Sequence, residues 1–296
     1  MSKLTRRECN KLILGTFAGS CAAALLPLNE MLSTPKINST INGVLIGAQS
    51  YSFRDRPLDK AIEGYAEVGL SSSELWQGHV EPKGLSRDDL RNWRLTTPLS
   101  TFQDIRAKFN RAGVDIYAYN YSVRGDFTDE EIARGFEIAK ALGAKCITAS
   151  SQPDVARRID VQAKKYKMRV GMHNHSNIRP NEFATPDDFA KAMEGTSEYI
   201  CINLDIGHFT AANFDAVDFL TRHHARIVTL HLKDRKRNQG DNVVFGQGDT
   251  PIKAVLELLK KNKWKIPANI EYEYKGEDTL AEMKKSFAYC RQALGA

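Results

Sequence analysis

Eight short runs of β-forming residues alternate with longer amphipathic stretches along this chain of 296 residues, and this repeat restricts the fold more than any other feature. The runs cover residues 43–51, 69–77, 113–121, 143–150, 168–175, 199–208, 225–234 and 266–274. Three of the helical patterns between them run into the next strand through a glycine that stops the helix, at Gly69, Gly113 or Gly143. Eight βα units in about 250 residues predict an α/β fold, a single closed (βα)8 TIM barrel.

A doubly wound open sheet is the competing architecture for such a repeat. That kind of sheet usually carries a glycine-rich nucleotide turn after its first strand, but here the turn reads QSYSFRDRP. The motifs GxGxxG and GxxxxGKS/T do not occur in the sequence. The barrel is therefore the better prediction, and it places an active site at the carboxyl ends of the strands and in the loops that follow them.

The first 35 residues predict an export signal and linker ahead of a barrel domain at residues 42–296. A basic start is followed by the apolar run LILGTFAGSCAAALLPL, and TRRECNK, with Arg6 and Arg7, resembles the twin-arginine signal of exported bacterial proteins. We expect a periplasmic protein without a membrane span, because about 17 apolar residues interrupted by glycine and proline are short for a span. A lipoprotein anchored through Cys21 is the alternative, since GSC weakly resembles a lipoprotein cleavage site.

The charge of the chain argues against a polyanionic partner. The formal net charge is +6, and the N-terminal segment accounts for +2 of it, with four basic and two acidic residues. The remaining +4 is spread over the barrel, and the densest basic run, KDRKR, contains an acidic residue and no aromatic one. We expect a small-molecule partner and no nucleic acid, and the sequence leaves a homo-oligomer open.

Ionisable and amide side chains gather at the predicted carboxyl ends of the strands. They are Glu74 and Gln77, His173 and His175, Asp205 and His208, His231 and Lys233, and Glu271 and Glu273. Alternate residues of a strand face the same side, so one member of the pair His173 and His175 must lie nearer the centre of the barrel mouth than the other. Imidazoles and carboxylates that converge on one mouth are suited to a divalent metal ion.

From its first strand to its last helix, the chain resembles the sugar phosphate isomerase/epimerase superfamily, a group of xylose isomerase-like barrels. The resemblance is carried by the motifs NLDIGH, LHLKD, FGQGD and NIEYE. In that family one divalent ion is held by Glu, Asp, His and Glu from strands five to eight. The resemblance implies that Asp205, His231 and Glu271 are metal ligands, and that His173 replaces the glutamate of the fifth strand.

The replacement of that glutamate by His173 has two implied consequences. Two carboxylates and two neutral imidazoles balance the charge of a 2+ ion, and this donor set favours Mn, Co, Zn or Fe over Mg and Ca, which prefer all-oxygen sites. In ketose epimerases the missing glutamate is also one of two opposed bases. Its loss weakens the case for two-sided epimerisation, and makes β-elimination from a 3-keto-glycoside, by a lyase or dehydratase, the alternative reaction.

The resemblance implies an isomerase or epimerase that removes a proton next to the carbonyl of a sugar and stabilises the enediolate by Lewis-acid catalysis. His175, Glu74 and Glu273 are the candidate bases, and Glu271 joins them as a catalytic residue. His208 is expected to bind a substrate oxygen. Lys233 either polarises the carbonyl or extends into solvent.

Four further residues are expected to bind the substrate, namely Gln77, Trp76, Tyr119 and Arg237. The aromatic rings near the strand ends, which also include Tyr51 and Phe53, would either stack on a sugar ring or pack in the core and at the rim. Export favours a non-phosphorylated sugar or glycoside as the substrate, because sugar phosphates are cytoplasmic metabolites.

Two other functions are compatible with such a barrel. Endonuclease IV has this fold and a DxxH motif, but most of its additional metal-binding histidines and acids have no counterpart in this sequence. The second function is sugar binding without catalysis, which a binding isotherm without product formation would reveal.

Overall fold

The computed structural model describes residues 37–276 and 278–296. The predicted export signal and Cys21 lie outside the described residues. Eight parallel strands form the fold: β2 (Val44–Gln49), β3 (Ser72–Trp76), β4 (Asp115–Asn120), β5 (Cys146–Ala149), β6 (Arg169–His173), β7 (Ile200–Asp205), β8 (Ile227–Leu232) and β11 (Ala268–Ile270). Each strand pairs with the next one along the chain, β11 pairs with β2, and the sheet closes on itself. The predicted single (βα)8 barrel and its eight strands are confirmed.

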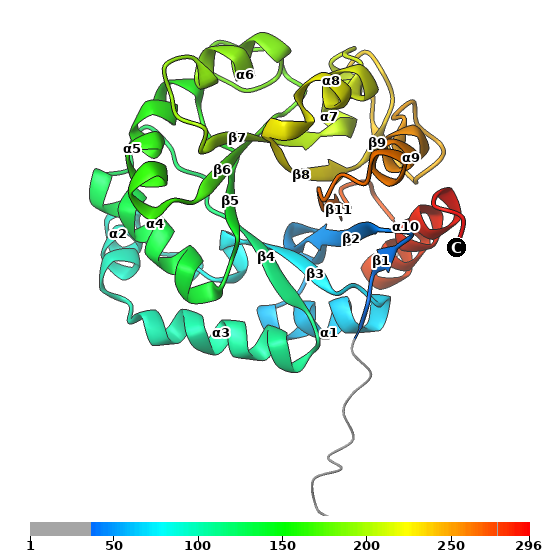
Figure 1. Ribbon diagram of the computed structural model, residues 1–296. Helices are drawn as coiled ribbons and strands as arrows, with labels where there is room; N and C mark the ends of the chain where they lie inside the picture. Colours follow the sequence, from blue (N-terminus) through cyan, green and yellow to red (C-terminus); the bar gives the residue numbers. More distant parts are fainter. Residues whose placement is uncertain (1–36, 277) are drawn as a thin grey trace, which may run out of the picture. The chain divides into compact units, whose positions relative to one another are not determined.

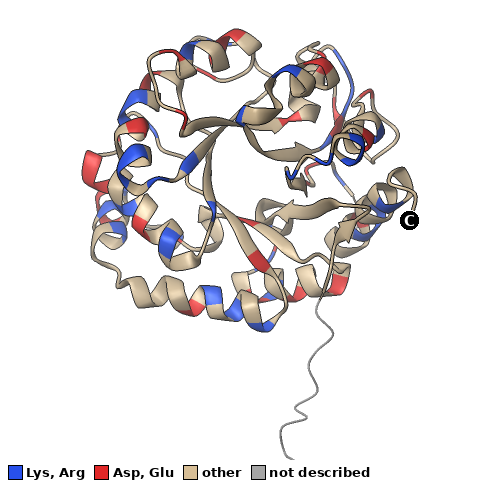
Figure 2. Ribbon diagram, in the orientation of Figure 1, with Lys and Arg blue, Asp and Glu red and all other residues tan. Residues whose placement is uncertain are grey.

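Helices surround the barrel (Figure 1). They are α1 (Leu58–Val68), α2 (Arg87–Thr96), α3 (Leu99–Arg111), α4 (Asp129–Leu142), α5 (Ala156–Tyr166), α6 (Pro186–Met193), α7 (Ile206–Ala211), α8 (Ala216–His223), α9 (Ile252–Asn262) and α10 (Thr279–Ala293). Within the described residues, no helix is both long and apolar enough to cross a membrane. In the view of Figure 2, basic and acidic residues alternate around these helices.

Three short strands lie outside the eight-stranded barrel and leave its topology unchanged. Strand β1 (Thr40–Ile41) pairs antiparallel with β2, and β9 (Asp234–Arg235) pairs antiparallel with β10 (Asn242–Val243). The β9–β10 pair belongs to the segment that follows β8, on the side of the barrel where the polar strand ends gather. None of these three short strands was expected from the sequence.

The ends of α4 show how the sequence sets the helix boundaries. The hydroxyl of Thr128 accepts a hydrogen bond from the backbone N–H of Glu131, whose carboxylate accepts one from the backbone N–H of Thr128. This capping box satisfies backbone donors that the first turn leaves free. The helix ends at Gly143, whose φ of +76° lies in the left-handed region that glycine adopts without a Cβ penalty. The prediction that Gly143 stops this helix is therefore confirmed.

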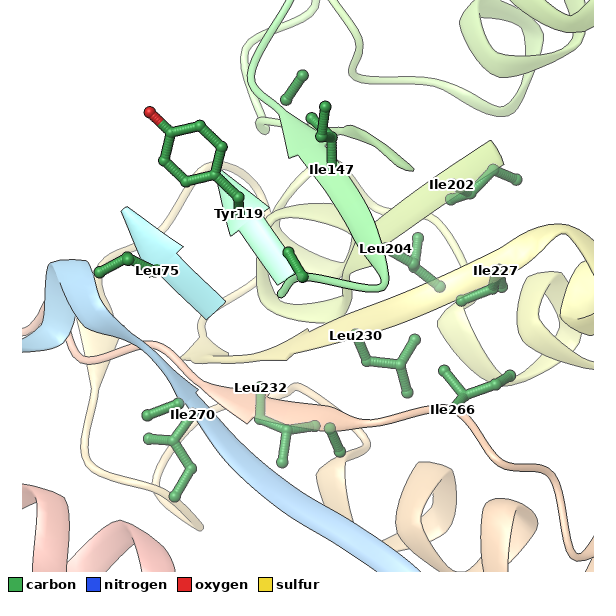
Figure 3. Packing of buried hydrophobic residues seen from close by; sticks show 14 of the residues in the cluster. Leu75, Tyr119, Ile147, Ile202, Leu204, Ile227, Leu230, Leu232, Ile266 and Ile270 are labelled. Atoms are coloured by element: carbon green, nitrogen blue, oxygen red, sulfur yellow. The ribbon is translucent and has the colours of Figure 1, made fainter. Parts of the chain in front are cut away.

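The hydrophobic core lies mainly between the strands and the helices (Figure 3). Leu75, Ile147, Leu204 and Leu230 belong to it and have almost no exposed surface. Alternate residues of the strands turn into the barrel instead. There Ala118, Cys146, Cys201 and Val228 form a small separate apolar cluster that joins strands on opposite sides of the barrel. The other inward-facing residues are largely polar, and they lead up to the site.

Candidate active site

A cavity of about 520 Å³ opens where the sequence predicts the active site, at the carboxyl ends of the barrel strands. Volumes of this order are typical of small-molecule sites. The predicted catalytic and substrate-binding residues that line it are Trp76, Gln77, His175, His208, Lys233, Glu271 and Glu273. Tyr51, which the sequence suggested as a stacking residue, also lines the cavity, and its ring lies edge-on to Trp76 with 5.0 Å between the centroids.

The four predicted metal ligands lie together at the base of this site. One potential ligand atom from each of His173, Asp205, His231 and Glu271 lies within 4.8 Å of the other three, and all four residues are buried. The Nδ1 atom of His231 is 2.9 Å from Oε2 of Glu271 and 3.9 Å from Oδ2 of Asp205. The spacing is that of donor groups around a shared centre.

Two buried atoms of this cluster make no hydrogen bond within the described residues. The Nδ1 atom of His173 and the Oδ2 atom of Asp205 are buried and make no hydrogen bond, although the ammonium of Lys233 lies 3.1 Å from the Asp205 oxygen. A buried polar atom normally has a hydrogen-bond partner, because leaving it unpaired costs about 1–3 kcal/mol. A neutral imidazole nitrogen and a carboxylate oxygen are both ligands of borderline divalent cations. The donor set therefore fits a divalent ion.

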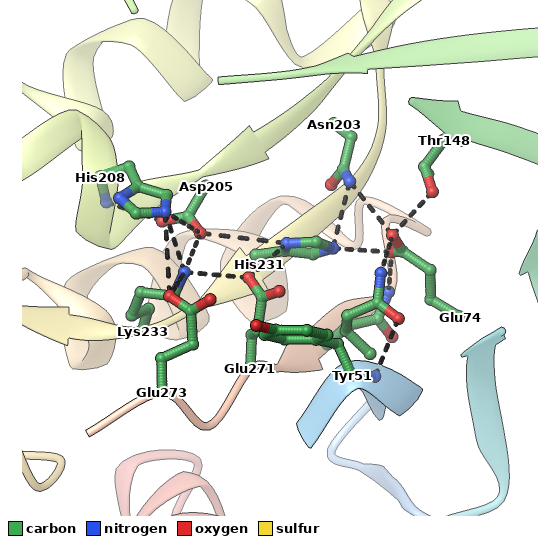
Figure 4. A network of polar contacts seen from close by, with 12 residues as sticks. Tyr51, Glu74, Thr148, Asn203, Asp205, His208, His231, Lys233, Glu271 and Glu273 are labelled. Atoms are coloured by element: carbon green, nitrogen blue, oxygen red, sulfur yellow. Dashed lines mark hydrogen bonds and ion pairs between the residues drawn. The ribbon is translucent and has the colours of Figure 1, made fainter. Parts of the chain in front are cut away.

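Lys233 is a buried cation within the same cluster (Figure 4). Its side chain is 2% exposed, and its Nζ atom is 2.6 Å from Glu273, 3.0 Å from Glu271 and 3.1 Å from Asp205. Burial lowers the pKa of Lys233, but the three carboxylates outweigh burial and raise the pKa above its usual value. The residue stays charged inside the site, so the alternative that it extends into solvent is wrong.

The ligand residues differ in how the site shifts their pKa values. Burial raises the pKa of Asp205 to about 6, against the lowering effect of Lys233. Burial also acts to raise the pKa of Glu271, but Lys233 and His231 outweigh it and lower the pKa overall. Burial, followed by the charge of His231, lowers the pKa of His173. His173 is therefore neutral, and its ring nitrogen has a free electron pair.

His175 stands beside the ligand cluster and faces the cavity. The centroid of its ring is 5.1 Å from that of His173 and 5.5 Å from that of His208. The ring is partly exposed, whereas His173 is 4% exposed. Burial and the charge of Lys233 lower the pKa of His175, which favours the neutral imidazole. The structure thus separates the two histidines in the way that the strand alternation predicts.

Arg235 holds His208 and was not predicted from the sequence. Its Nη1 atom is 2.8 Å from Nδ1 of His208 and 2.8 Å from the hydroxyl of Ser176, and its guanidinium also donates to the backbone carbonyl of Gly240. The guanidinium of Arg235 and the ammonium of Lys233 can only donate, and a neutral imidazole has a single acceptor nitrogen, so the ring of His208 accepts a hydrogen bond from only one of these two cations. Nε2 lies beside Lys233, at 3.0 Å from Nζ.

Arg237, the arginine that was predicted to reach the cavity, is exposed and does not line it. Strand alternation puts residues 231, 233, 235 and 237 on the same side, so the alternation pointed equally to Arg235 and Arg237. Arg235 is only two residues beyond the buried Lys233, whereas Arg237 lies past the end of β9 and its backbone N–H donates to Asp249. The substrate contact predicted for Arg237 is therefore not supported, and Arg235, which does not line the cavity either, contacts His208 instead.

Glu74 does not line the cavity, although the sequence suggested it as a base. Its side chain has no exposed surface, and its Oε2 atom is 2.9 Å from Nε2 of His231, on the side of the ring away from Glu271. A base has to come within hydrogen-bond reach of the proton that it removes. We therefore no longer assign the role of base to Glu74.

Tyr119 and Phe53 also lie away from the cavity. Tyr119 is fully buried among the hydrophobic side chains outside the barrel (Figure 3), and its ring stacks on Tyr121 at 5.7 Å. Its neighbour Asn120 is the residue of β4 that lines the cavity, because the side-chain direction alternates along a strand. The substrate contact predicted for Tyr119 is corrected accordingly. Phe53 is fully buried and packs on Tyr65, as the core alternative expected.

The wall of the cavity formed by α2 and by the loop after β4 was missed by the sequence analysis. Arg87, Arg94, Arg124 and Asp126 line it. Arg87 and Arg94 both donate to the buried carboxylate of Glu131. Since α2 lies between two barrel units and carries no motif at a strand end, nothing in the sequence marked these residues.

Comparison with known proteins agrees with the fold. The model of the xylose isomerase-like TIM barrel family matches residues 65–293. The structure of 3-keto-D-glucoside 4-epimerase YcjR from E. coli is 15% identical, with a TM-score of 0.65, over 84% of this chain and 99% of that chain. No protein of known function in the curated set matches this sequence.

Two further solved structures share the barrel. The IolI protein with a bound zinc atom is 16% identical, with a TM-score of 0.64, over 84% of this chain and 98% of that chain. The probable 3-DHS dehydratase AsbF from Bacillus anthracis is 14% identical, with a TM-score of 0.61, over 82% of this chain and 97% of that chain. At these identities the likeness shows the fold alone, whereas the family match spans most of the described barrel. This protein belongs to the xylose isomerase-like TIM barrel family.

Proposed function

We propose that this protein is a divalent-metal-dependent enzyme that acts on a non-phosphorylated keto-sugar or glycoside by removing a proton next to its carbonyl, in the manner of an isomerase or epimerase. The observation that carries the proposal is the buried cluster of His173, Asp205, His231 and Glu271. Three of these residues line the polar cavity, so a substrate in the cavity would meet the cluster directly.

The ligand set determines the chemistry that a bound ion would supply. His173, Asp205, His231 and Glu271 would hold one ion of Mn, Co, Zn or Fe, because the set has two imidazoles and two carboxylates. Such an ion acts as a Lewis acid toward a carbonyl oxygen. The zinc bound to IolI, a protein with the same fold, supports a metal in a barrel of this kind.

His175 is the proposed base. Its ring lines the cavity beside the ligand His173, and no other described side chain forms a hydrogen bond with it. An imidazole in this position is within reach of a substrate that contacts the ligand cluster. Glu273 also lines the cavity and is 24% exposed, but its Oε2 atom is held by Lys233 at 2.6 Å. The carboxylate is therefore less available for proton transfer than the imidazole.

His208 and Lys233 are the proposed binding groups for substrate oxygens. His208 lines the cavity, and the guanidinium of Arg235 holds its ring in place. Lys233 provides a buried positive charge next to the ligand carboxylates. The rings of Tyr51 and Trp76 would stack on the sugar, and the predicted export signal favours a substrate without a phosphate group.

Elimination is the second candidate reaction, and His173 is the observation that favours it. His173 occupies the place of the glutamate that serves related epimerases as the second base. A site with one base can remove the proton and release a β-substituent, whereas inversion at a carbon needs a proton donor on the opposite face. A keto-glycoside would then be cleaved.

The proposed function is tested with the purified protein in D₂O. Metal is removed with a chelator, Mn, Co, Zn or Fe is restored, and the protein is incubated with keto-sugars and 3-keto-glycosides under NMR and mass spectrometry. We expect metal-dependent deuterium incorporation at the carbon next to the carbonyl. Loss of the β-substituent would identify elimination instead of isomerisation. Saturable sugar binding without deuterium exchange would contradict catalysis and support a sugar-binding barrel.

A further inference from the structure

The carboxylate of Glu74 is the centre of a polar layer inside the barrel, below the cavity. Its Oε1 atom accepts hydrogen bonds from Gln49 at 2.9 Å and from Thr148 at 2.7 Å, and its Oε2 atom accepts one from Asn269 at 3.0 Å. These donors belong to β2, β5 and β11, and Glu74 itself belongs to β3. A buried carboxylate whose two oxygens accept this many hydrogen bonds is fixed in position.

Glu74 also contacts a proposed metal ligand. Its Oε2 atom is 2.9 Å from Nε2 of His231, whereas Nδ1 of the same ring faces Glu271 and Asp205. Both oxygens of Glu74 accept hydrogen bonds from their other neighbours, so Nε2 of His231 is the donor in this contact and Nδ1 is the nitrogen that faces the ligand cluster. Figure 4 shows the ring of His231 between the carboxylates of Glu74 and Glu271.

The side chain of Asn203 also contacts Nε2 of His231. Its Nδ2 atom lies 3.1 Å from Nε2 of His231, while its Oδ1 atom accepts a hydrogen bond from the hydroxyl of Thr229. The amide and a protonated Nε2 cannot donate to each other. The carboxylate of Glu74 decides between them, because it accepts from Nε2 of His231 at 2.9 Å and also offers an acceptor to the amide of Asn203 at 3.4 Å.

We infer that Glu74 is a positioning residue that sets the tautomer and orientation of His231, so that Nδ1 of His231 is presented to the proposed metal site. The inference rests on that site, and it gives the polar layer a purpose beyond packing. Six barrel strands meet at Glu74, since His231 on β8 and Asn203 on β7 complete the set. Such carboxylate–histidine pairs fix the ring of a metal-binding histidine.

The first test compares two variants of this layer. Glu74→Gln keeps the shape of the side chain but removes its charge, and we expect metal affinity to fall about 10- to 100-fold in a chelator competition assay. Thr148→Val is the matched control, because it removes a donor from Oε1 and leaves the contact between Oε2 and His231 in place. Its metal affinity should stay within about 3-fold of the parent. Equal losses in the two variants would show that Glu74 acts only through the packing of the layer.

The second test needs no variant, so it holds even if Glu74→Gln fails to fold. Nitrogen-15 shifts of labelled histidine, assigned to His231 by the spectrum of a His231→Gln variant, report which ring nitrogen carries a proton. We expect a protonated Nε2 both in the metal-free protein and after addition of Zn. An unprotonated Nε2 would overturn the inference. A metal-free protein with a protonated Nε2 that binds no metal would instead contradict the proposed function alone.

Discussion

The rings of His173 and His175 lie 5.1 Å apart between their centroids and stand almost perpendicular, at 85°. Both rings line the cavity, but only His173 belongs to the cluster of potential metal ligands, and only His175 is partly exposed. Two residues of spacing at the end of β6 therefore separate the proposed ligand from the proposed base. The roles of the pair can be tested independently.

Replacing each histidine by alanine should give different losses. His173→Ala should lose metal affinity and turnover together, because it removes a ligand. His175→Ala should retain metal and lose turnover by about 10²–10⁴-fold, the range that a general base contributes. The checks are metal content and the rate of deuterium exchange into a keto-sugar. If His175→Ala exchanged protons at the parent rate, the base would be elsewhere, and Glu273 would be the next candidate.

Lys233→Met should destabilise the protein chiefly in its metal-free form. The substitution keeps most of the side-chain volume but leaves the carboxylates of Asp205, Glu271 and Glu273 without their ammonium. Breaking a buried ion pair costs about 3–5 kcal/mol, and a bound divalent ion would offset part of this cost. Thermal unfolding with and without metal measures the difference. Equal destabilisation in both states would contradict a shared site for Lys233 and the ion.

Acid should lower the free energy of unfolding of the protein through protonation of Glu131. Burial acts to raise the pKa of this carboxyl group, but hydrogen bonds from Arg87, from the backbone of Thr128, and from Arg91 and Arg94 lower it to about 2. Because the folded pKa lies below the unfolded value, the stabilisation is complete above about pH 4.5 and is lost as the pH falls toward 2.

Glu131→Gln provides the measurement for this acid effect. The variant should be less stable than the parent at neutral pH, and its free energy of unfolding should fall less steeply between pH 5 and pH 2. Glu63→Gln is the control, because Glu63 is an exposed helix residue paired only with Lys60. If the free energy of unfolding of Glu131→Gln and of the parent fell in parallel with pH, this would contradict the stabilisation of ionised Glu131 by its arginine partners.

The motif FGQGD is explained by Asp234, the last residue of LHLKD. Its carboxylate accepts hydrogen bonds from the backbone N–H groups of Gly246 at 2.7 Å, Gly248 at 3.0 Å and Thr250 at 3.2 Å. A Cβ atom at Gly248 would lie 1.9 Å from the carboxylate. Gly248→Ala should therefore cost about 1–3 kcal/mol in denaturant unfolding. Gly125→Ala, where a Cβ would make an ordinary contact at 3.6 Å, should cost less than half as much.

The fold and the ligand cluster were predictable because both depend on order along the chain. The eight strands alternate with helices, and parallel barrel strands carry their carboxyl ends to one mouth, so residues such as Asp205 and His231 had to meet. The alternation of sides along each strand was also predictable, but not which side faces the cavity. On β4 it places Asn120 and Tyr119 on opposite sides, and the structure shows that Asn120 lines the cavity.

The position of each side chain along the barrel axis was not predictable from the sequence. Glu74 and His231 point into the same barrel, but the stagger between their strands places Glu74 behind the ring of His231. Arg235 and Arg237 share a side of the chain after β8, and only the turn of β9 brings Arg235 to His208. Stagger and loop course depend on contacts between distant segments, which no local pattern records.

The metal content of the purified protein tests the central claim most directly. Inductively coupled plasma mass spectrometry, after chelator treatment and reloading with Mn, Co, Zn or Fe, counts the ions that each chain retains. We expect one equivalent of one of these metals in the parent protein and a loss of most of it in Asp205→Ala. A parent protein that retains no stoichiometric metal, or an Asp205→Ala variant that retains as much as the parent, would contradict it.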